Sequence, residues 1–395
     1  MEQDRKETRR VSMAVLASIS ALRGAFHNMR HVVWQPFVLS LGVPMRSLGG
    51  LESILDLSRI LVQPIVGGAS DAQGRRRWLV LQAALGLAIG VLTIFTGSWP
   101  LLLVIVVLLG FEGSLYNVWT ALVADSFEAD RLGRTYSVLT ACTTAAGLIA
   151  SLSAGFIAES YGFRVVFIIS TVFAFIGFLI VLFRLPETVK RTLDSGYSIR
   201  NVYRSLVDTL KPPPELRGFY IAMALDLFAF GMGYRLISGM LTRGYGYTPQ
   251  MLGIMATVMT ASMTVAQIPA GMFIERVGYA KYLALSQLLA CIYLGLVVYS
   301  KQFEVVLLAQ VLNGISAAVW GPAERAWIAG NVGIEERARA LGSYSTVRAL
   351  LSFPAPFIGG VLFDSYGLDV PVLLNIALAL VDIVLILTLI KDRGD

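Results

Sequence analysis

The stretch Gly67-Gly-Ala-Ser-Asp71-Ala-Gln-Gly74-Arg75-Arg76-Arg77 occurs a second time in this chain of 395 residues, in a degenerate form. A shift of 204 positions carries the glycines and the carboxylate of the first copy onto Gly271, Glu275 and Gly278, and the last arginine onto Lys281. Because both copies follow a long apolar run, each predicts a short turn between two helices.

The repeat extends well beyond these two stretches. The shift of 204 also lays Gly42 and Gly49 onto Gly246 and Gly253, and Gln63 onto Gln267. A shift of 205 lays residues 155–162 onto 360–367, and Arg134 onto Arg339. We therefore predict two halves of the same fold. Parallel repeats related by an axis along the membrane normal are typical of transporters that rock one half against the other.

Composition indicates that both halves lie in a lipid bilayer. Hydrophobic residues make up 56% of the chain and charged residues 15%, and the mean hydropathy is +0.70. Crossing about 30 Å of hydrocarbon takes about 20 apolar residues in a helix. Apolar runs of this length predict an all-α protein with twelve transmembrane helices, at 12–41, 48–70, 78–97, 100–124, 135–158, 164–185, 218–242, 250–273, 280–300, 304–329, 341–363 and 370–390.

The basic residues predict the orientation of these helices. The net charge is +6, but the basic residues are scattered singly between apolar runs, which argues against a nucleic-acid partner. Counted over alternate loops and tails, 22 Lys and Arg fall on one side and 4 on the other. The positive-inside rule then places both termini in the cytoplasm. We expect the first apolar run to be a retained helix rather than a signal peptide.

The longest connection divides the chain into the expected domains. It is charged and contains Pro212-Pro213-Pro214, as a linker between bundles does. We predict an N-terminal six-helix bundle at 1–185, a cytoplasmic linker at 186–217 and a C-terminal six-helix bundle at 218–395. The two cysteines, Cys142 and Cys291, lie in apolar runs and indicate neither a disulfide framework nor a metal site.

The repeated loop resembles the signature loop of the major facilitator superfamily, in which a glycine and an aspartate are followed by arginine, a second glycine and further basic residues. Ala72 stands where the family has its first arginine, whereas Arg276 keeps it in the second copy. The resemblance implies that Asp71 closes an inner gate by meeting the start of the eleventh helix, near 339–342. The corresponding gating motif is Gly67, Asp71, Gly74, Arg75, Arg134, Glu275 and Arg276. A solvated turn that only sets topology is the alternative.

Two further signatures of proton-coupled drug antiporters in this family are absent. The position about twenty residues before Asp125 is Ile105, where such antiporters carry an arginine. The fifth predicted helix has no proline among its glycines at 147–155. Drug antiport is therefore one candidate among several.

Charged residues inside the predicted helices mark the candidate site. Six basic and six acidic side chains lie there, and equal numbers predict ion pairs or a wet cavity. The basic ones are Arg23, Arg30, Arg59, Arg235, Arg325 and Arg348, and the acidic ones are Glu52, Asp56, Glu112, Asp226, Glu324 and Asp382.

Helix spacing gathers some of these residues in the first half. His27, Arg30 and His31 share one stripe of the first helix, and Asp56 lies at a matching depth in the second. With Glu112 they are our candidates for substrate binding or proton coupling, because histidine and a desolvated carboxylate can change protonation near neutral pH. Structural ion pairs between the helices are the alternative. The spacing of His27 and His31 also suits a metal ion, although Arg30 would repel one.

In the second half, Asp226, Tyr234, Trp320 and Glu324 are the corresponding candidates. Aromatic and polar groups together suit a solute with apolar and polar parts. Ordinary packing of the aromatic residues, or an inner gate built from the charged ones, would use the same residues.

These observations predict a secondary active transporter of a small organic solute in the cytoplasmic membrane. We expect proton coupling, with symport and antiport both open, and a monomer without a cofactor. A transporter-fold receptor or scaffold, or a metal-ion transporter using His27 and His31, is the alternative. A membrane enzyme is disfavoured, because the sequence has no nucleophile-and-base pattern and no phosphate-binding loop.

Overall fold

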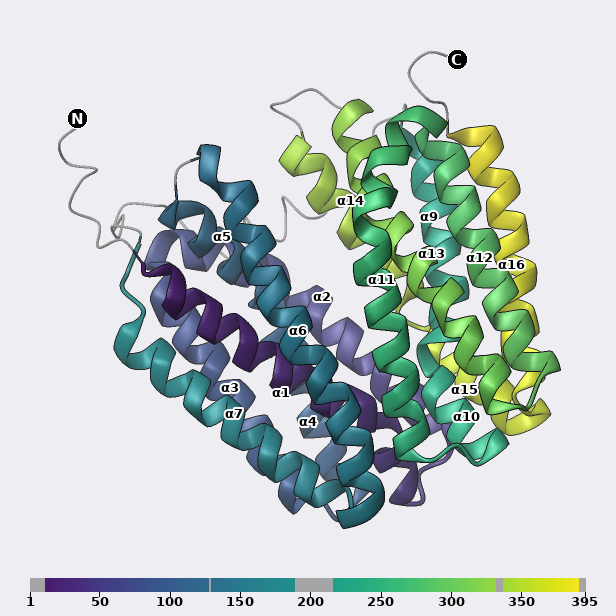
Figure 1. The fold of residues 1–395 in the computed structure, drawn as a ribbon, viewed down its shortest axis with the longest axis horizontal. Helices are drawn as coiled ribbons and strands as arrows, with labels where there is room; N and C mark the ends of the chain where they lie inside the picture. Colours follow the sequence, from purple (N-terminus) through teal and green to yellow (C-terminus); the bar gives the residue numbers. More distant parts are fainter. Residues whose placement is uncertain (1–10, 128, 189–215, 332–336, 391–395) are drawn as a thin grey trace. The chain divides into compact units, whose positions relative to one another are not determined.

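The structure, a computed structural model, describes residues 11–127, 129–188, 216–331 and 337–390 (Figure 1). All regular structure in these ranges is helical, and ten of the helical stretches are long and apolar enough to cross a bilayer. Helices α1 (Met13–Ser40) and α2 (Met45–Gln73) have 28 and 29 residues and fall outside that set of ten. The predicted all-helical membrane fold is confirmed, and each expected span corresponds to one helix or to two or three consecutive helical elements.

The chain forms two compact units. Unit 1 consists of residues 1–33 and 54–205, and unit 2 of residues 34–53 and 206–395. Unit 1 therefore holds most of α1 and α2, and unit 2 holds the end of α1 and the beginning of α2. The other helices of unit 1 are α3 (Arg75–Phe95), α4 (Trp99–Ser114), α5 (Tyr116–Ser126), α6 (Ala129–Tyr161) and α7 (Phe163–Arg184).

Unit 2 contains the remaining helices, and α12 lies between α13 and α16 in its packing. These elements are α9 (Arg217–Met232), the short 3-10 helix η2 (Tyr234–Leu236), α10 (Ile237–Tyr245), α11 (Pro249–Val277), α12 (Tyr279–Tyr299), α13 (Phe303–Asn331), α14 (Arg337–Ser352), α15 (Ala355–Tyr366) and α16 (Asp369–Leu389).

Three predicted spans are interrupted helices. The fourth breaks at Leu115 between α4 and α5, and the eleventh breaks before Ala355, where Pro354 is the N-cap of α15. The seventh breaks at Gly233, where Asn375 of α16 accepts a hydrogen bond from the Tyr234 N–H at 3.1 Å. A Cβ at Gly233 would stand 2.6 Å from the Asn375 side-chain oxygen, so the break needs glycine at this position.

Backbone geometry repeats between the units at the spacing seen in the sequence. Among the described residues, positive φ occurs only at six glycines, which form the pairs Gly42 and Gly246, Gly74 and Gly278, and Gly162 and Gly367. Each pair is related by 204 or 205 positions and differs in φ by 10° or less. The same turns therefore close corresponding helices in both halves.

Close helix contacts repeat as well. A Cβ at Gly110 of α4 would lie 2.6 Å from the Leu55 carbonyl oxygen of α2. At Gly314 of α13, 204 positions later, it would lie 2.5 Å from the Met259 carbonyl oxygen of α11. Both glycines thus let two backbones meet directly, and the two helix pairs are equivalent in the repeat.

Candidate functional site

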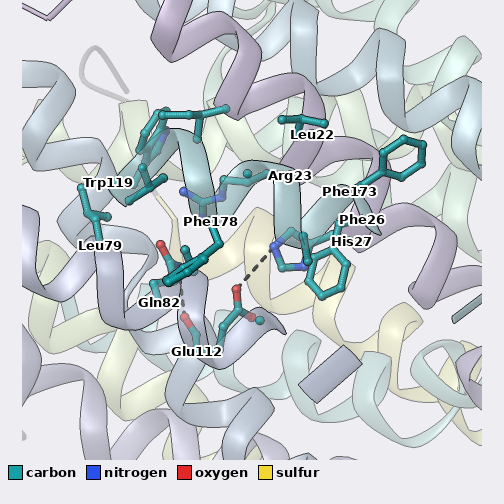
Figure 2. A pocket seen from close by; sticks show the side chains of 16 residues that line it. Leu22, Arg23, Phe26, His27, Leu79, Gln82, Glu112, Trp119, Phe173 and Phe178 are labelled. Atoms are coloured by element: carbon teal, nitrogen blue, oxygen red, sulfur yellow. Dashed lines mark hydrogen bonds and ion pairs between the residues drawn. The ribbon is translucent and has the colours of Figure 1, made fainter. Parts of the chain in front are cut away.

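The first cluster of polar side chains lies within unit 1. Helical spacing places Arg23, His27 and Arg30 on one stripe of α1, and Glu112 projects from α4. Figure 2 shows the Glu112 carboxylate pointing to the His27 ring, with Nε2 and Oε1 3.5 Å apart. Glu112 is buried, and Gln82 of α3 donates to its backbone carbonyl at 3.1 Å. These contacts join α1, α3 and α4, of which α1 and α4 were expected to carry the site.

The two arginines give this cluster an excess of positive charge. Arg30 lies 3.4 Å from His27 Nδ1 and over the Phe26 ring, and its buried Nη1 has no hydrogen-bond partner in the described part of the chain. Arg23 lies over the Trp119 ring at 5.2 Å from its centroid. Two guanidinium groups and a histidine therefore surround a single buried carboxylate.

The cavity at this cluster has a volume of only 50 Å³. Its lining includes Arg23, His27, Glu112 and Trp119. Ligand pockets for drug-sized molecules usually measure about 300–1,000 Å³. This cavity suits a few water molecules and an exchanging proton rather than an organic solute.

A much larger cavity lies within unit 2, with a volume of 370 Å³. Helices α9, α11, α12, α13, α14 and α16 contribute to its walls. Tyr234 and Trp320 supply aromatic surface, and Asp226, Glu324 and Arg348 supply charge. The four sequence candidates of the second half thus line one cavity.

Arg348 of α14 organises the charges in this cavity. Its Nη2 donates to Asp226 Oδ2 at 2.6 Å, and its Nη1 pairs with Glu324. Tyr344, one turn earlier in α14, donates its hydroxyl to the same Glu324 oxygen. The carboxylates come from α9 and α13, so a single guanidinium connects three helices, and the charge-assisted bonds hold it firmly.

A second polar chain fixes Tyr234 in the cavity wall. Asn313 donates to the Tyr234 hydroxyl at 2.8 Å and to Gln310 Oε1 at 2.9 Å. Gln310 in turn donates to the buried Tyr293 hydroxyl at 2.9 Å. Because each member is held by the next, Tyr234 presents a defined face to the cavity.

Gln287 of α12 and Asp382 of α16 were missed as a pair in the sequence. One Gln287 nitrogen, Nε2, donates to Asp226 Oδ1 and to Asp382 Oδ2, each at 2.8 Å. An uncharged amide 95 positions away gave no charge pattern from which to identify the partner of Asp382.

Residues 34–53, the end of α1 and the beginning of α2, form their polar contacts inside unit 2. Glu52 accepts hydrogen bonds from Trp34 at 3.2 Å and from two nitrogens of Arg235 at 3.2 and 3.3 Å. Asp364 of α15 accepts from the backbone N–H groups of Met45 and Arg46 at the start of α2. A carboxylate at a helix N-terminus satisfies free N–H groups and complements the helix dipole.

His31 and Asp56 are the remaining predicted residues of α1 and α2. His31 is exposed and Asp56 is half-buried, and neither lines the small cavity. In the part of the chain that is described, no group of three His, Cys, Asp or Glu side chains could hold a metal ion. Of the candidates from the first half, the structure brings together His27, Arg30 and Glu112.

The structure describes the side chains of only part of the gating motif. Gly67 lies inside α2, and Gly74 has a φ of +94° at the turn to α3. Arg75 pairs with Asp125 of α5, while the Glu187 carboxylate accepts from the Arg75 N–H at 2.9 Å. Arg134 is exposed. The structure does not describe the side chains of Asp71, Glu275 and Arg276, nor those of the expected partner region 339–342, so the gate stays a prediction.

Comparison with known proteins identifies the class. The family model described as Major Facilitator Superfamily matches residues 12–242 and 219–395. A multidrug resistance protein MdtG of Salmonella arizonae is 25% identical over 348 residues, covering 84% of this chain and 83% of that protein. The chain spans a similar share of MdtG from Salmonella typhimurium, also at 25% identity. The chain belongs to the major facilitator superfamily of membrane transporters.

Solved structures share the fold at low sequence identity. The peptide transporter POT (E310Q mutant) matches with a TM-score of 0.77 at 12% identity, over 98% of this chain and 97% of that one. The nucleoside transporter NupG (D323A mutant) matches at 0.75 and 13%, over 96% and 100%. The human organic anion transporter MFSD10 (TETRAN) matches at 0.69 and 18%, over 96% and 99%.

Proposed function

We propose that this transporter moves a small amphipathic organic solute by secondary active, proton-coupled transport, and that unit 2 binds the solute. The observation that carries the proposal is the cavity of 370 Å³, which combines Tyr234 and Trp320 with the Asp226–Arg348–Glu324 network. Aromatic surface holds the apolar part of a solute, while the charged groups orient its polar part.

The His27–Glu112 pair is our candidate for proton coupling in unit 1. The pair is in contact, belongs to two helices and borders a cavity too small for a solute. A carboxylate beside a histidine and two arginines can gain or lose a proton as those groups move. The relatives include proteins named for multidrug resistance, which supports the proposal that this chain transports a solute.

We also propose that the protein is a monomer in the cytoplasmic membrane with both termini on the cytoplasmic side. The distribution of Lys and Arg between alternate loops supports this orientation. Cysteine substituted at position 195 should react with membrane-impermeant reagents only after the cells are opened. Labelling at this position in intact cells would contradict the orientation.

The test of the function is transport by purified protein in liposomes, with and without a pH gradient. The panel comprises tetraphenylphosphonium as a lipophilic cation, benzoate as an aromatic anion, uridine and dialanine. We expect gradient-dependent movement of at least one amphipathic compound. No movement of any panel compound in either gradient would contradict the proposal.

A variant then connects transport to the cavity. Trp320→Ala removes aromatic surface from the cavity wall and should weaken the apparent affinity for the transported solute about tenfold, or ~1.4 kcal/mol. Trp99→Ala at the exposed start of α4 is the matched control and should leave the affinity unchanged. Equal apparent affinities for the solute in Trp320→Ala and Trp99→Ala would show that the solute binds outside this cavity.

A further inference from the structure

Asp382 is a buried carboxyl group that forms no ion pair with any of the described residues. It lies in the middle of α16, and none of its surface is accessible (0%). Gln287 donates to Oδ2 at 2.8 Å, but Oδ1 has no hydrogen-bond partner among the described residues. The same residues offer it no basic group within ion-pairing distance. An ionised carboxylate in these surroundings is costly, because burial removes its hydration without replacing it.

The neighbouring charges increase this cost. Gln287 Nε2 also donates to Asp226, so two carboxyl groups are bridged by one nitrogen. Arg348 already bonds the other oxygen of Asp226 and pairs with Glu324. Two carboxylates this close repel each other. Because Asp226 and Glu324 share the positive charge of Arg348, Asp382 is the group of the three that holds a proton.

The helices packed against α16 present few other titratable groups here. Cys291 of α12 is buried beside Asp382, with its Sγ 4.0 Å from a carbonyl oxygen of α16. On α15, Asp364 and Tyr366 are at the C-terminal end, where Asp364 bonds the start of α2. Besides burial, Asp226, Gln287 and Arg348 are therefore the groups that govern the protonation of Asp382.

The repeat shows that the fold does not require an acid at this position. The shifts of 204 and 205 bring Gln287 onto Ala83 and Asp382 onto Gly177 of unit 1. A Cβ at Gly177 would lie 3.9 Å from the Cβ of Leu22, and Leu22, Ala83 and Gly177 all line the small cavity of unit 1. The equivalent positions in unit 1 therefore carry neither the acid nor the amide, so the costly acid in unit 2 calls for a functional reason.

Asp382 is also bonded to a residue that lines the solute cavity. Gln287 and Ala379 line that cavity, whereas Asp382, one turn after Ala379, does not. A rotation of the Gln287 amide away from Asp382 would open a short path between the carboxyl group and cavity water.

We propose that Asp382 is a second proton-binding site, distinct from His27 and Glu112, and that Gln287 positions and shields it. Its carboxylate takes a proton from water in the cavity and returns the same proton to that water. A cationic solute at Asp226 and Glu324 adds positive charge, favours the ionised form of Asp382 and displaces the proton, whereas an anionic solute retains it. The coupling role rests on the proposed function, but the protonation does not.

Infrared difference spectroscopy tests the protonation without transport. The wild-type protein in lipid should show the carbonyl band of a protonated carboxyl group at pH 7, and Asp382→Asn should lack it. Asp369→Asn, an exposed acid of the same helix, is the control and should retain the band. An identical band in wild type and Asp382→Asn would overturn the proposal.

Gln287→Met supplies a second measurement if Asp382→Asn does not fold. Without the amide donor, the band should remain and move to higher wavenumber, because a hydrogen bond to the carbonyl lowers its stretching frequency. A band that does not move would show that it belongs to another carboxyl group.

Transport assays then test the coupling role, using the panel compound that the wild-type protein accumulates. Asp382→Asn is fixed in a neutral form, so solute exchange at equal pH should continue, while accumulation driven by the pH gradient should fall at least about tenfold, or ~1.4 kcal/mol. Unchanged accumulation would overturn the coupling role of Asp382. Failure of the wild-type protein to transport any panel compound would instead contradict the proposed function, and the infrared result would stand by itself.

Discussion

The polar clusters of unit 1 and unit 2 are built on equivalent helices but carry opposite charge. In unit 1, Arg23, Arg30 and His27 surround the carboxylate of Glu112, whereas in unit 2 Arg348 pairs with the two carboxylates of Asp226 and Glu324. The backbone contacts beneath the clusters are the same, since Gly110 and Gly314 approach equivalent carbonyl groups. The repeat therefore conserves helix packing, while the chemistry differs between its halves.

Even the shared polar contacts show this difference. Gln82 donates to the Glu112 carbonyl at 3.1 Å, and Ser286, 204 positions after Gln82, donates to the Ser316 carbonyl at 2.9 Å. The hydrogen bond to the backbone persists, but a carboxylate in unit 1 is replaced by a hydroxyl in unit 2. The hydrogen bonds to backbone groups maintain the fold in both units. The side chains that differ between the units are available for transport.

The largest effect should come from Arg348→Gln, which leaves Asp226 and Glu324 without their cation. Breaking a buried ion pair from one side typically costs about 3–5 kcal/mol. We expect a large drop in the thermal unfolding midpoint and loss of transport. Adding Asp226→Asn and Glu324→Gln should restore part of the stability.

The corresponding change in unit 1, Arg30→Gln, should cost far less, because Arg30 Nη1 is buried without a hydrogen-bond partner among the described residues. If Arg348→Gln and Arg30→Gln destabilised the protein equally, the fully paired arginine of unit 2 and the incompletely paired arginine of unit 1 would not differ in their contribution to stability.

Glu112→Gln should leave the protein folded and reduce transport driven by a pH gradient about tenfold, or ~1.4 kcal/mol. The amide keeps the shape of the side chain but cannot exchange a proton. Initial rates at several pH values in liposomes provide the measurement, and Glu159→Gln at the exposed end of α6 is the control. Wild-type rates and pH dependence in Glu112→Gln would make the His27–Glu112 contact structural.

Gly110→Ala and Gly314→Ala should destabilise the protein to a similar degree, by roughly 1–3 kcal/mol each. Each new methyl group would overlap a backbone oxygen of the facing helix. Gly271→Ala adds a methyl group in open space within α11 and should stay within about 0.5 kcal/mol of wild type. Thermal unfolding in detergent measures all three. Unequal costs at Gly110 and Gly314 would show that the halves pack differently despite the repeat.

The smallest effect is expected for Asp125→Asn, which breaks the pair with Arg75. Both side chains are partly exposed, and such pairs contribute about 1 kcal/mol or less. Transport should slow a few-fold with little change in the unfolding midpoint. Complete loss of transport would place Asp125 in the machinery that moves the solute.

The sequence predicted the helices well because apolar length and the positions of repeated glycines are local properties. The break at Gly233 was not predicted, since it depends on Asn375 from a distant helix. In the candidate site, helical spacing joined His27 and Arg30, but it could not reveal that Glu52 pairs with Arg235, 183 positions away. Long-range partners follow from packing, and an uncharged partner such as Gln287 leaves no charge signal.

Helices α1 and α2 each belong to both units, with boundaries after Val33 and before Ile54. Any rearrangement between the units must therefore either bend these two continuous helices near the boundaries or detach residues 34–53 from unit 2. Detachment would break the bonds from Glu52 to Arg235 and from Asp364 to the start of α2 together. Because several hydrogen bonds hold this segment to unit 2, breaking only one of them does not free it. The segment therefore favours two discrete states, attached and detached, over a continuum of intermediate ones.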